Sequence, residues 1–152
     1  MALGMENGNI NDSQITASSE LDTKHRAANA RLNFTPRDGR NGAWSSGKKD
    51  LNQWLQVDFQ RSTLVTGIST QGRENKDQFV KNYTVSFSQD GNNFQDYTQK
   101  GAVKVFKGNI DKNSIVHHHL MPPISARFIR VHPMAFYKYI SMRVEFYGCP
   151  AT

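Results

Sequence analysis

Residues 54–59 read Trp-Leu-Gln-Val-Asp-Phe, and this stretch sets the pattern from which the fold is predicted. Leu55, Val57 and Phe59 are apolar, and the residues between them are polar. Because successive side chains of a β-strand point to opposite faces, the alternation puts one face on a core and leaves the other more polar. The stretch therefore predicts a half-buried β-strand.

The same two-residue alternation recurs further along the chain, in residues 83–88, 129–132 and 142–147. Residues 64–70 are rich in β-branched side chains and predict another strand. Asp90 and Gly91 stand between two strand-like runs, which is a strong hairpin signal. Short strands separated by turn-rich pieces predict an all-β domain.

Helices are not predicted. Residues 23–32 come nearest to a helical period, but their apolar face consists only of Ala27, Ala28 and Ala30. A helix there would have little to bury, so we expect a loop. Antiparallel strands without helices to cover a sheet predict two sheets packed face to face.

Length and charge narrow the classes of protein. The chain has 152 residues, the size of one domain, and a net charge of +6. Its apolar runs fall far short of the roughly 20 residues that a membrane-spanning helix needs. The basic balance favours anionic partners, although net charge alone says nothing about clustering. The first six residues lack the features of a signal peptide, which fits a cytoplasmic protein or a trimmed fragment with an added start Met. We expect the fragment.

Motifs along almost the whole chain resemble the discoidin domain, also called the coagulation factor V/VIII type C domain. The matching segments, in chain order, are residues 3–8, 12–19, 30–33, 42–44, 53–59, 70–73, 83–91, 108–109, 122–124, 127–131 and 142–149. Each motif is weak alone, but together and in this order they are specific.

The resemblance implies one discoidin domain over residues 1–152, trimmed from a larger extracellular protein. The implied fold is a galactose-binding-like jelly-roll β-sandwich with protruding loops, called spikes, at one end. A secreted or cell-surface setting, no catalysis and no cofactor are expected. In the family the closing Cys, here Cys149, pairs with a Cys just before residue 3, which this chain lacks. Cys149 is therefore expected to be free or to bridge two chains.

By resemblance the three spikes are residues 20–29, 34–50 and 72–80. We expect them to form the ligand-binding end, with these candidate residues: Leu21, Lys24, His25, Arg26, Asp38, Arg40, Lys48, Lys49, Arg73, Lys76 and Phe79. The expected partner is an anionic or polar protein or glycan on a cell surface or in the matrix. Oligomeric state is left open.

Binding to phosphatidylserine membranes is the main alternative. Family members that insert into such membranes carry large apolar residues at the spike tips, whose burial in lipid is favourable. Here Leu21 is the large apolar residue of the first spike. Phe79 is that of the third, and its alternative role is to begin a core strand. Protein or glycan recognition is therefore favoured over deep lipid insertion.

The binding sites for three other ligands of the family are matched only in part by this sequence. The peptide pocket of neuropilin-type domains needs aromatic walls and a carboxylate, for which Leu21, His25 and Asp50 are poor equivalents. The trench of collagen-binding receptors is matched by Arg73 and Asp38, but Leu21 replaces its Trp. Trp44 belongs to the shared framework and is expected to pack inside. A lectin site could use the arginines, but the spikes offer no obvious stacking aromatic ring.

An enzyme is the competing class, and its best signal is His117-His118-His119. Adjacent strand residues alternate faces, so His117 and His119 could share a metal while His118 could not. No Cys or Glu cluster nearby completes a zinc site, so no metal is expected. Hydrolase, phosphate-loop and dinucleotide motifs are missing from the sequence. The basic residues are dispersed without an aromatic-basic motif, so no nucleic-acid partner is expected.

Overall fold

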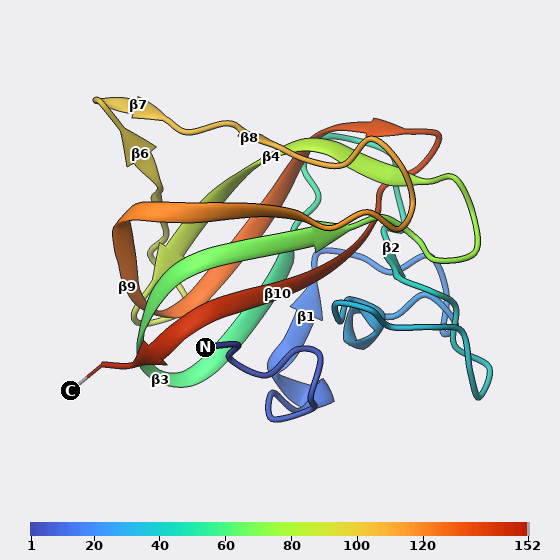
Figure 1. The fold of residues 1–152 in the computed structure, drawn as a ribbon, viewed down its shortest axis with the longest axis horizontal. Coiled ribbons are helices and arrows are strands. Elements are labelled where there is room, and N and C mark those ends of the chain that lie inside the picture. The colour runs from blue at the N-terminus through green and yellow to red at the C-terminus, as the bar shows by residue number, and fades with distance from the viewer. Residues whose placement is uncertain (152) are drawn as a thin grey trace.

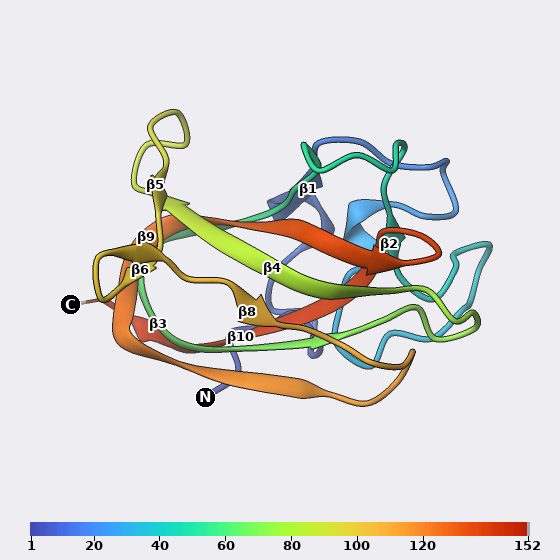
Figure 2. The ribbon, with the colours of Figure 1, turned by 90° about the horizontal axis from the view of Figure 1, so that it is seen from above.

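Two long strands, β3 and β9, connect both layers of the fold in a computed structural model that describes residues 1–151 (Figures 1 and 2). The elements are η1 (Asp12–Gln14), β1 (Ile15–Ala17), η2 (Ala27–Asn29), β2 (Trp44–Ser45), β3 (Leu55–Gln71), β4 (Phe79–Ser88), β5 (Gln95–Asp96), β6 (Thr98–Gln99), β7 (Ala102–Val103), β8 (Phe106–Lys107), β9 (Val116–Tyr137) and β10 (Ser141–Pro150). All strand pairs are antiparallel. The all-β jelly-roll sandwich is confirmed.

The strands follow the order β2-β10-β3-β9-β4-β5, with β1 beside β3 and β8 beside β4. The last third of β3 lies between β10 and the start of β9 in one layer. The first residues of β3 lie between β1 and the later part of β9 in the other layer, where β4 continues the sheet. The β3–β9 register shifts between Asp58 and Thr63 and again between Val65 and Gly67. These irregularities let both strands bend from one layer into the other (Figure 2).

The core follows the predicted alternation. Met142, Val144 and Phe146 are 0–1 % exposed, and Leu55 and Val57 are equally buried on the opposing sheet. The other face of β10 is not solvated as predicted, since Arg143 and Glu145 are each 1 % exposed. Loops cover Arg143, and the Glu145 carboxylate accepts hydrogen bonds from the backbone of residues 5 and 6.

The local structure differs from the predictions in two places. Residues 54–59 and 64–70 were expected as separate strands, but they are parts of the single bent strand β3. The expected loop 23–32 contains the 3₁₀ turn η2, in which Ala27 and Ala28 are buried. The hairpin expected at Asp90 and Gly91 is present, because β5 pairs with the end of β4. No helix in residues 1–151 is long and apolar enough to cross a membrane.

The two chain ends lie at the end of the sandwich opposite the spikes (Figure 1). Cys149 lies there on β10 and has an exposed, free thiol. Its neighbour Gly148 sits at the bulge where the β10–β3 register shifts. Gly148 has φ of 155°, and a Cβ there would overlap the carbonyl oxygen of Leu64. Only glycine fits this close approach of two backbones.

We therefore predict that Gly148→Ala lowers the free energy of unfolding by roughly 2–4 kcal/mol, since the methyl group must displace β3. Gly101→Ala is the matched control. Gly101 also has positive φ, 79°, but a Cβ there meets nothing within 4 Å. Its cost should be about 1 kcal/mol from backbone strain alone. Urea denaturation of both variants measures the difference, and equal losses would contradict the steric explanation.

Candidate functional site

The second and third spikes are held at their bases by one buried guanidinium, that of Arg143 on β10. It donates to the carbonyl oxygens of Phe34 (2.9 Å), Gly72 (2.7 Å) and Lys112 (2.9 Å). A fourth hydrogen bond, 2.7 Å long, goes to the Oδ1 atom of Asn113. Burial lowers the pKa of Arg143 to about 10, so the group is still charged at neutral pH. The second spike, the third spike and the loop 108–115 thus share one anchor.

The first spike, residues 20–29, is folded around two carboxylates. Asp22 Oδ1 accepts a hydrogen bond from the backbone of Lys24 and lies 2.6 Å from Nδ1 of His25. The hydrogen bond with His25 is the main reason that the pKa of Asp22 lies below its usual value. Glu20 accepts from the backbone of Ala27. His25 is 7 % exposed, so its ring is part of the loop framework.

The second spike, residues 34–50, reaches its tip in a tight turn between Arg37 and Arg40. These two residues exchange backbone hydrogen bonds, and Asp38 and Gly39 between them have φ of 49° and 73°. Asp-Gly is the residue pair that such a turn favours. Arg37 and Arg40 both lie over the ring of Phe34, with centroid distances of 4.4 and 4.7 Å.

Arg40 is committed to the framework more than Arg37 is. Its Nε donates to Asn29 Oδ1 at 2.7 Å, and Nη1 lies 3.9 Å from Asp12. Burial lowers the pKa of Arg40, with neighbouring arginines adding to the effect. Trp44, as predicted, is fully buried, and its indole donates to the Ser19 carbonyl.

The third spike, residues 72–80, is closed by Arg73. Arg73 is 6 % exposed and donates to the side chains of Asn75 and Gln78. Burial lowers the pKa of Arg73. Phe79 is 8 % exposed and stacks on Tyr137 at 5.1 Å, because it is the first residue of β4.

The candidate residues therefore fall into two groups. The side chains of His25, Arg73 and Phe79 are buried and hold the loops, and Arg40 is half-buried. The exposed candidates are Leu21, Lys24, Arg26, Asp38, Lys48, Lys49 and Lys76. Charge and position in the sequence do not separate the groups, because the separation depends on partners in other loops.

The loop 108–115 at the same end was missed by the sequence reasoning. The backbone amides of Gly108 and Asn109 donate to the start of β4, and Gln71 at the end of β3 donates to Asn113. Ile110 at its tip is 76 % exposed. Isoleucine near a strand reads as a core residue, so the sequence carried no signal that this one faces solvent.

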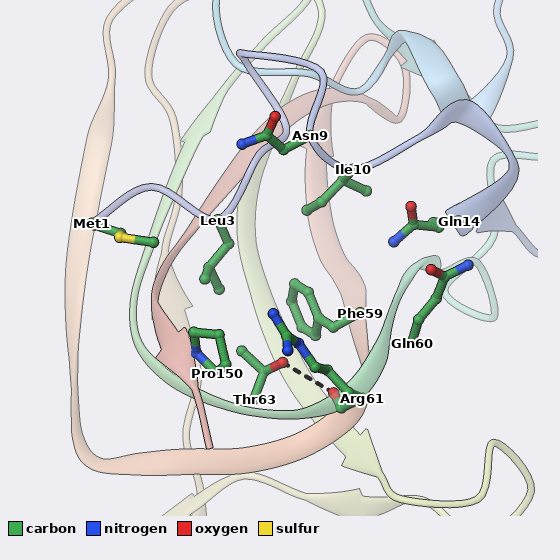
Figure 3. Close-up of a pocket in the computed structure, with 10 residues that line it drawn as sticks. All are labelled: Met1, Leu3, Asn9, Ile10, Gln14, Phe59, Gln60, Arg61, Thr63 and Pro150. Carbon is green, nitrogen blue, oxygen red and sulfur yellow. Dashed lines mark hydrogen bonds between the residues drawn. The ribbon is translucent and has the colours of Figure 1, made fainter. Parts of the chain in front are cut away.

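The opposite end holds a pocket of about 510 Å³ beside the chain ends (Figure 3). Leu3, Ile10 and Phe59 line it together with Gln60 and the side chain of Arg61. It lies away from the spikes and is not part of the candidate site. No group of three or more His, Cys, Asp or Glu within residues 1–151 could hold a metal ion.

The molecule is a two-layer β-sandwich with polar loops clustered at one end. The buried polar side chains of these loops hold the loops in place. This arrangement is typical of a recognition module. The F5/8 type C domain model matches residues 14–146, and the chain belongs to this family, which consists of non-catalytic binding modules. The resemblance to discoidin domains and the absence of enzymatic activity are thereby confirmed.

Relatives match over nearly the whole chain. Coagulation factor VIII of Canis lupus familiaris is 42 % identical over 98 % of this chain, and neuropilin-1 of Xenopus laevis is 36 % identical over 99 % of it. The chain spans only 6 % and 16 % of the lengths of these two proteins.

Solved structures agree with the fold. Discoidin II from Dictyostelium discoideum superposes with a TM-score of 0.83 at 32 % identity, over 91 % of this chain and 55 % of that one. A family 32 carbohydrate-binding module of NanJ from C. perfringens, in complex with galactose, superposes with a TM-score of 0.62. It is 20 % identical over 90 % of this chain and 96 % of that one, and it supports the fold alone.

We predict that Arg143→Met lowers the free energy of unfolding by about 3–5 kcal/mol, because four acceptors lose a charged donor in a buried site. Arg61→Met, an exposed change at the other end, should alter it by less than about 0.5 kcal/mol. Hydrogen exchange should also quicken in residues 34–50, 72–80 and 108–115. A uniform loss of protection without preference for these loops would contradict the role of Arg143 as their shared anchor.

Proposed function

We propose that this chain is an extracellular recognition and adhesion module, cut from a larger protein, that binds an anionic or polar protein or glycan through its spikes. The observation that carries the proposal is a set of exposed basic side chains in the spikes that form no salt bridge with residues 1–151. It includes Lys24, Arg26, Lys48, Lys49 and Lys76, beside the exposed Arg37 at the tip of the second spike. None of these five forms a salt bridge within the described part of the chain.

The contrast with the buried charges supports this proposal. Arg31 forms a salt bridge with Asp12 at 2.7 Å, and Arg143 and Arg73 donate hydrogen bonds to atoms of the loops. Other cations thus satisfy the buried acceptors of the fold, whereas the five exposed ones form no salt bridge in this part of the chain, and Lys49 only lies over the Tyr139 ring at 5.4 Å. A group of exposed cations attracts an anionic surface over roughly 10 Å at moderate salt.

The exposed cations indicate the class of ligand. Sulfated glycans and acidic protein surfaces present the closely spaced anions that several flexible lysines can meet. The family relationship supports ligand binding without catalysis. A secreted or cell-surface setting is the one in which such partners are met.

The test removes three of these charges together. Lys24→Ala/Arg26→Ala/Lys76→Ala should weaken binding to heparin-coated sensors about tenfold or more, since each contact contributes on the order of 0.5–1 kcal/mol. The affinity of the parent chain should fall steeply between 50 and 300 mM salt, roughly as counterion screening predicts.

The matched control removes the same net charge outside the spikes, at Arg61, Lys100 and Lys107, all of which are exposed. It should leave the affinity within about twofold. Equal losses in both triple variants would show that binding follows net charge, and would sink the assignment to the spikes.

Binding to phosphatidylserine membranes by the same end is the second candidate. The exposed leucine of the first spike, Leu21 (43 % exposed), is accompanied at the same end of the sandwich by Ile110 (76 % exposed) in the loop 108–115. Exposed apolar side chains beside lysines can enter the head-group region while the cations meet anionic lipid.

On this alternative, the Leu21→Ser/Ile110→Ser variant should sediment less with phosphatidylserine vesicles than the parent chain, at least about tenfold by affinity. Its heparin binding should not change. No difference between phosphatidylserine and phosphatidylcholine vesicles at low salt would rule the alternative out.

A further inference from the structure

The run His117-His118-His119 at the start of β9 does not lie on one face of the sheet. Nε2 of His118 lies 2.6 Å from the Lys107 carbonyl oxygen, and its ring packs edge-on against Phe106 at 5.2 Å. His117 and His119 are exposed on the opposite face. The structure thus separates the central histidine from its two neighbours.

The ring of His117 leans over Gly67 of β3. A Cβ built on Gly67 would lie only 2.9 Å from Cε1 and 3.2 Å from Nε2 of this ring. Gly67 is the residue that pairs directly with His119 across the strands. The ring of His117 therefore occupies the space where a side chain opposite His119 would stand. It can do so because position 67 has no side chain.

This placement puts the His117 ring beside the position that pairs with His119, on the sheet face that the two histidines share. Cβ atoms of directly opposed residues are about 4.5–5.5 Å apart, so a rotamer of His119 that turns toward Gly67 comes within reach of Nε2 of His117. Figure 1 shows the three strands β10, β3 and β9 running side by side. Tyr147 of β10 pairs with Gly67 from the other side, and its ring packs edge-on against His117 at 5.1 Å. Tyr147 thus limits the movement of the His117 ring away from His119.

The orientation of His117 is fixed by a further contact. Its Nδ1 lies 2.8 Å from the hydroxyl oxygen of Ser69. When Nδ1–H donates to this oxygen, Nε2 carries the free lone pair and points over Gly67. A hydrogen bond at one ring nitrogen that orients the other is the arrangement found behind histidines that bind metal ions.

We propose that His117 and His119 form a two-histidine site for a divalent transition-metal ion, with Ser69 as the positioning residue. Imidazole pairs suit Cu²⁺, Ni²⁺ and Zn²⁺, and affinity rises toward Cu²⁺ in this series. The protein supplies two nitrogen ligands, and the remaining positions are open to water or to a donor from a binding partner. The site lies on a sheet face and does not rest on the spike proposal.

The experiment is a titration of the untagged chain with Cu²⁺ in a buffer that does not coordinate the ion. We expect one equivalent to bind, with a paramagnetic resonance spectrum that shows coupling to two nitrogens. His117→Ala and His119→Ala should each weaken the affinity about tenfold or more, because chelation by two joined ligands is lost. Ser69→Ala should weaken it about tenfold while keeping both ligands.

His118→Ala is the matched control, because it removes a histidine from the same run but from the opposite face. Its affinity for Cu²⁺ should stay within about twofold of that of the parent chain, because both chelating histidines remain. A loss in His118→Ala as large as in its neighbours would overturn the proposal and leave adventitious binding to a histidine-rich strand. Substoichiometric binding by the parent chain, or coupling to one nitrogen alone, would overturn it as well.

Discussion

A single buried charge, the guanidinium of Arg143, determines how the binding end is held. Loops that leave a sheet expose carbonyl groups that no strand partner can satisfy, and burying them unpaired is costly. Arg143 provides donors in a rigid fork and satisfies three such carbonyls from three separate segments. The cost of burying its charge is offset by four short hydrogen bonds, and the loops gain fixed positions.

The course of β3 and β9 determines where those loops emerge. Because both strands cross from one layer to the other, the connections around them collect at the end opposite the chain termini. The bulge at Gly148 and the fully buried Trp44 belong to this framework. Irregular segments are therefore carried on a rigid sandwich, which is the arrangement that binding loops need.

The division between structural and exposed cations follows from the neighbours of each residue. Arg40 and Arg73 lie in spikes as Lys24 and Lys76 do, yet the two arginines are bonded to asparagine and glutamine side chains of the loops. A planar guanidinium suits such multiple contacts, whereas an ammonium on a flexible stem gains less from them. The lysines are left at the surface. Similarly, the half-buried His118 is held by the Lys107 carbonyl on one face of β9, while His117 and His119 are exposed on the other face, with the His117 ring over Gly67.

The sequence by itself determined the fold class, because alternation in stretches such as 54–59 depends only on the period of a strand. It also indicated the spike end through family motifs, and it separated His118 from its neighbours by parity. For Phe79 it offered the start of a core strand as an alternative, which the structure has, but it could not show that Arg73 and His25 are buried, since both depend on partners contributed by the packing of loops. Nor could it reveal the exposed Ile110. Only the tertiary structure decided which side chains are free, because burial and hydrogen bonding arise between segments far apart in the chain.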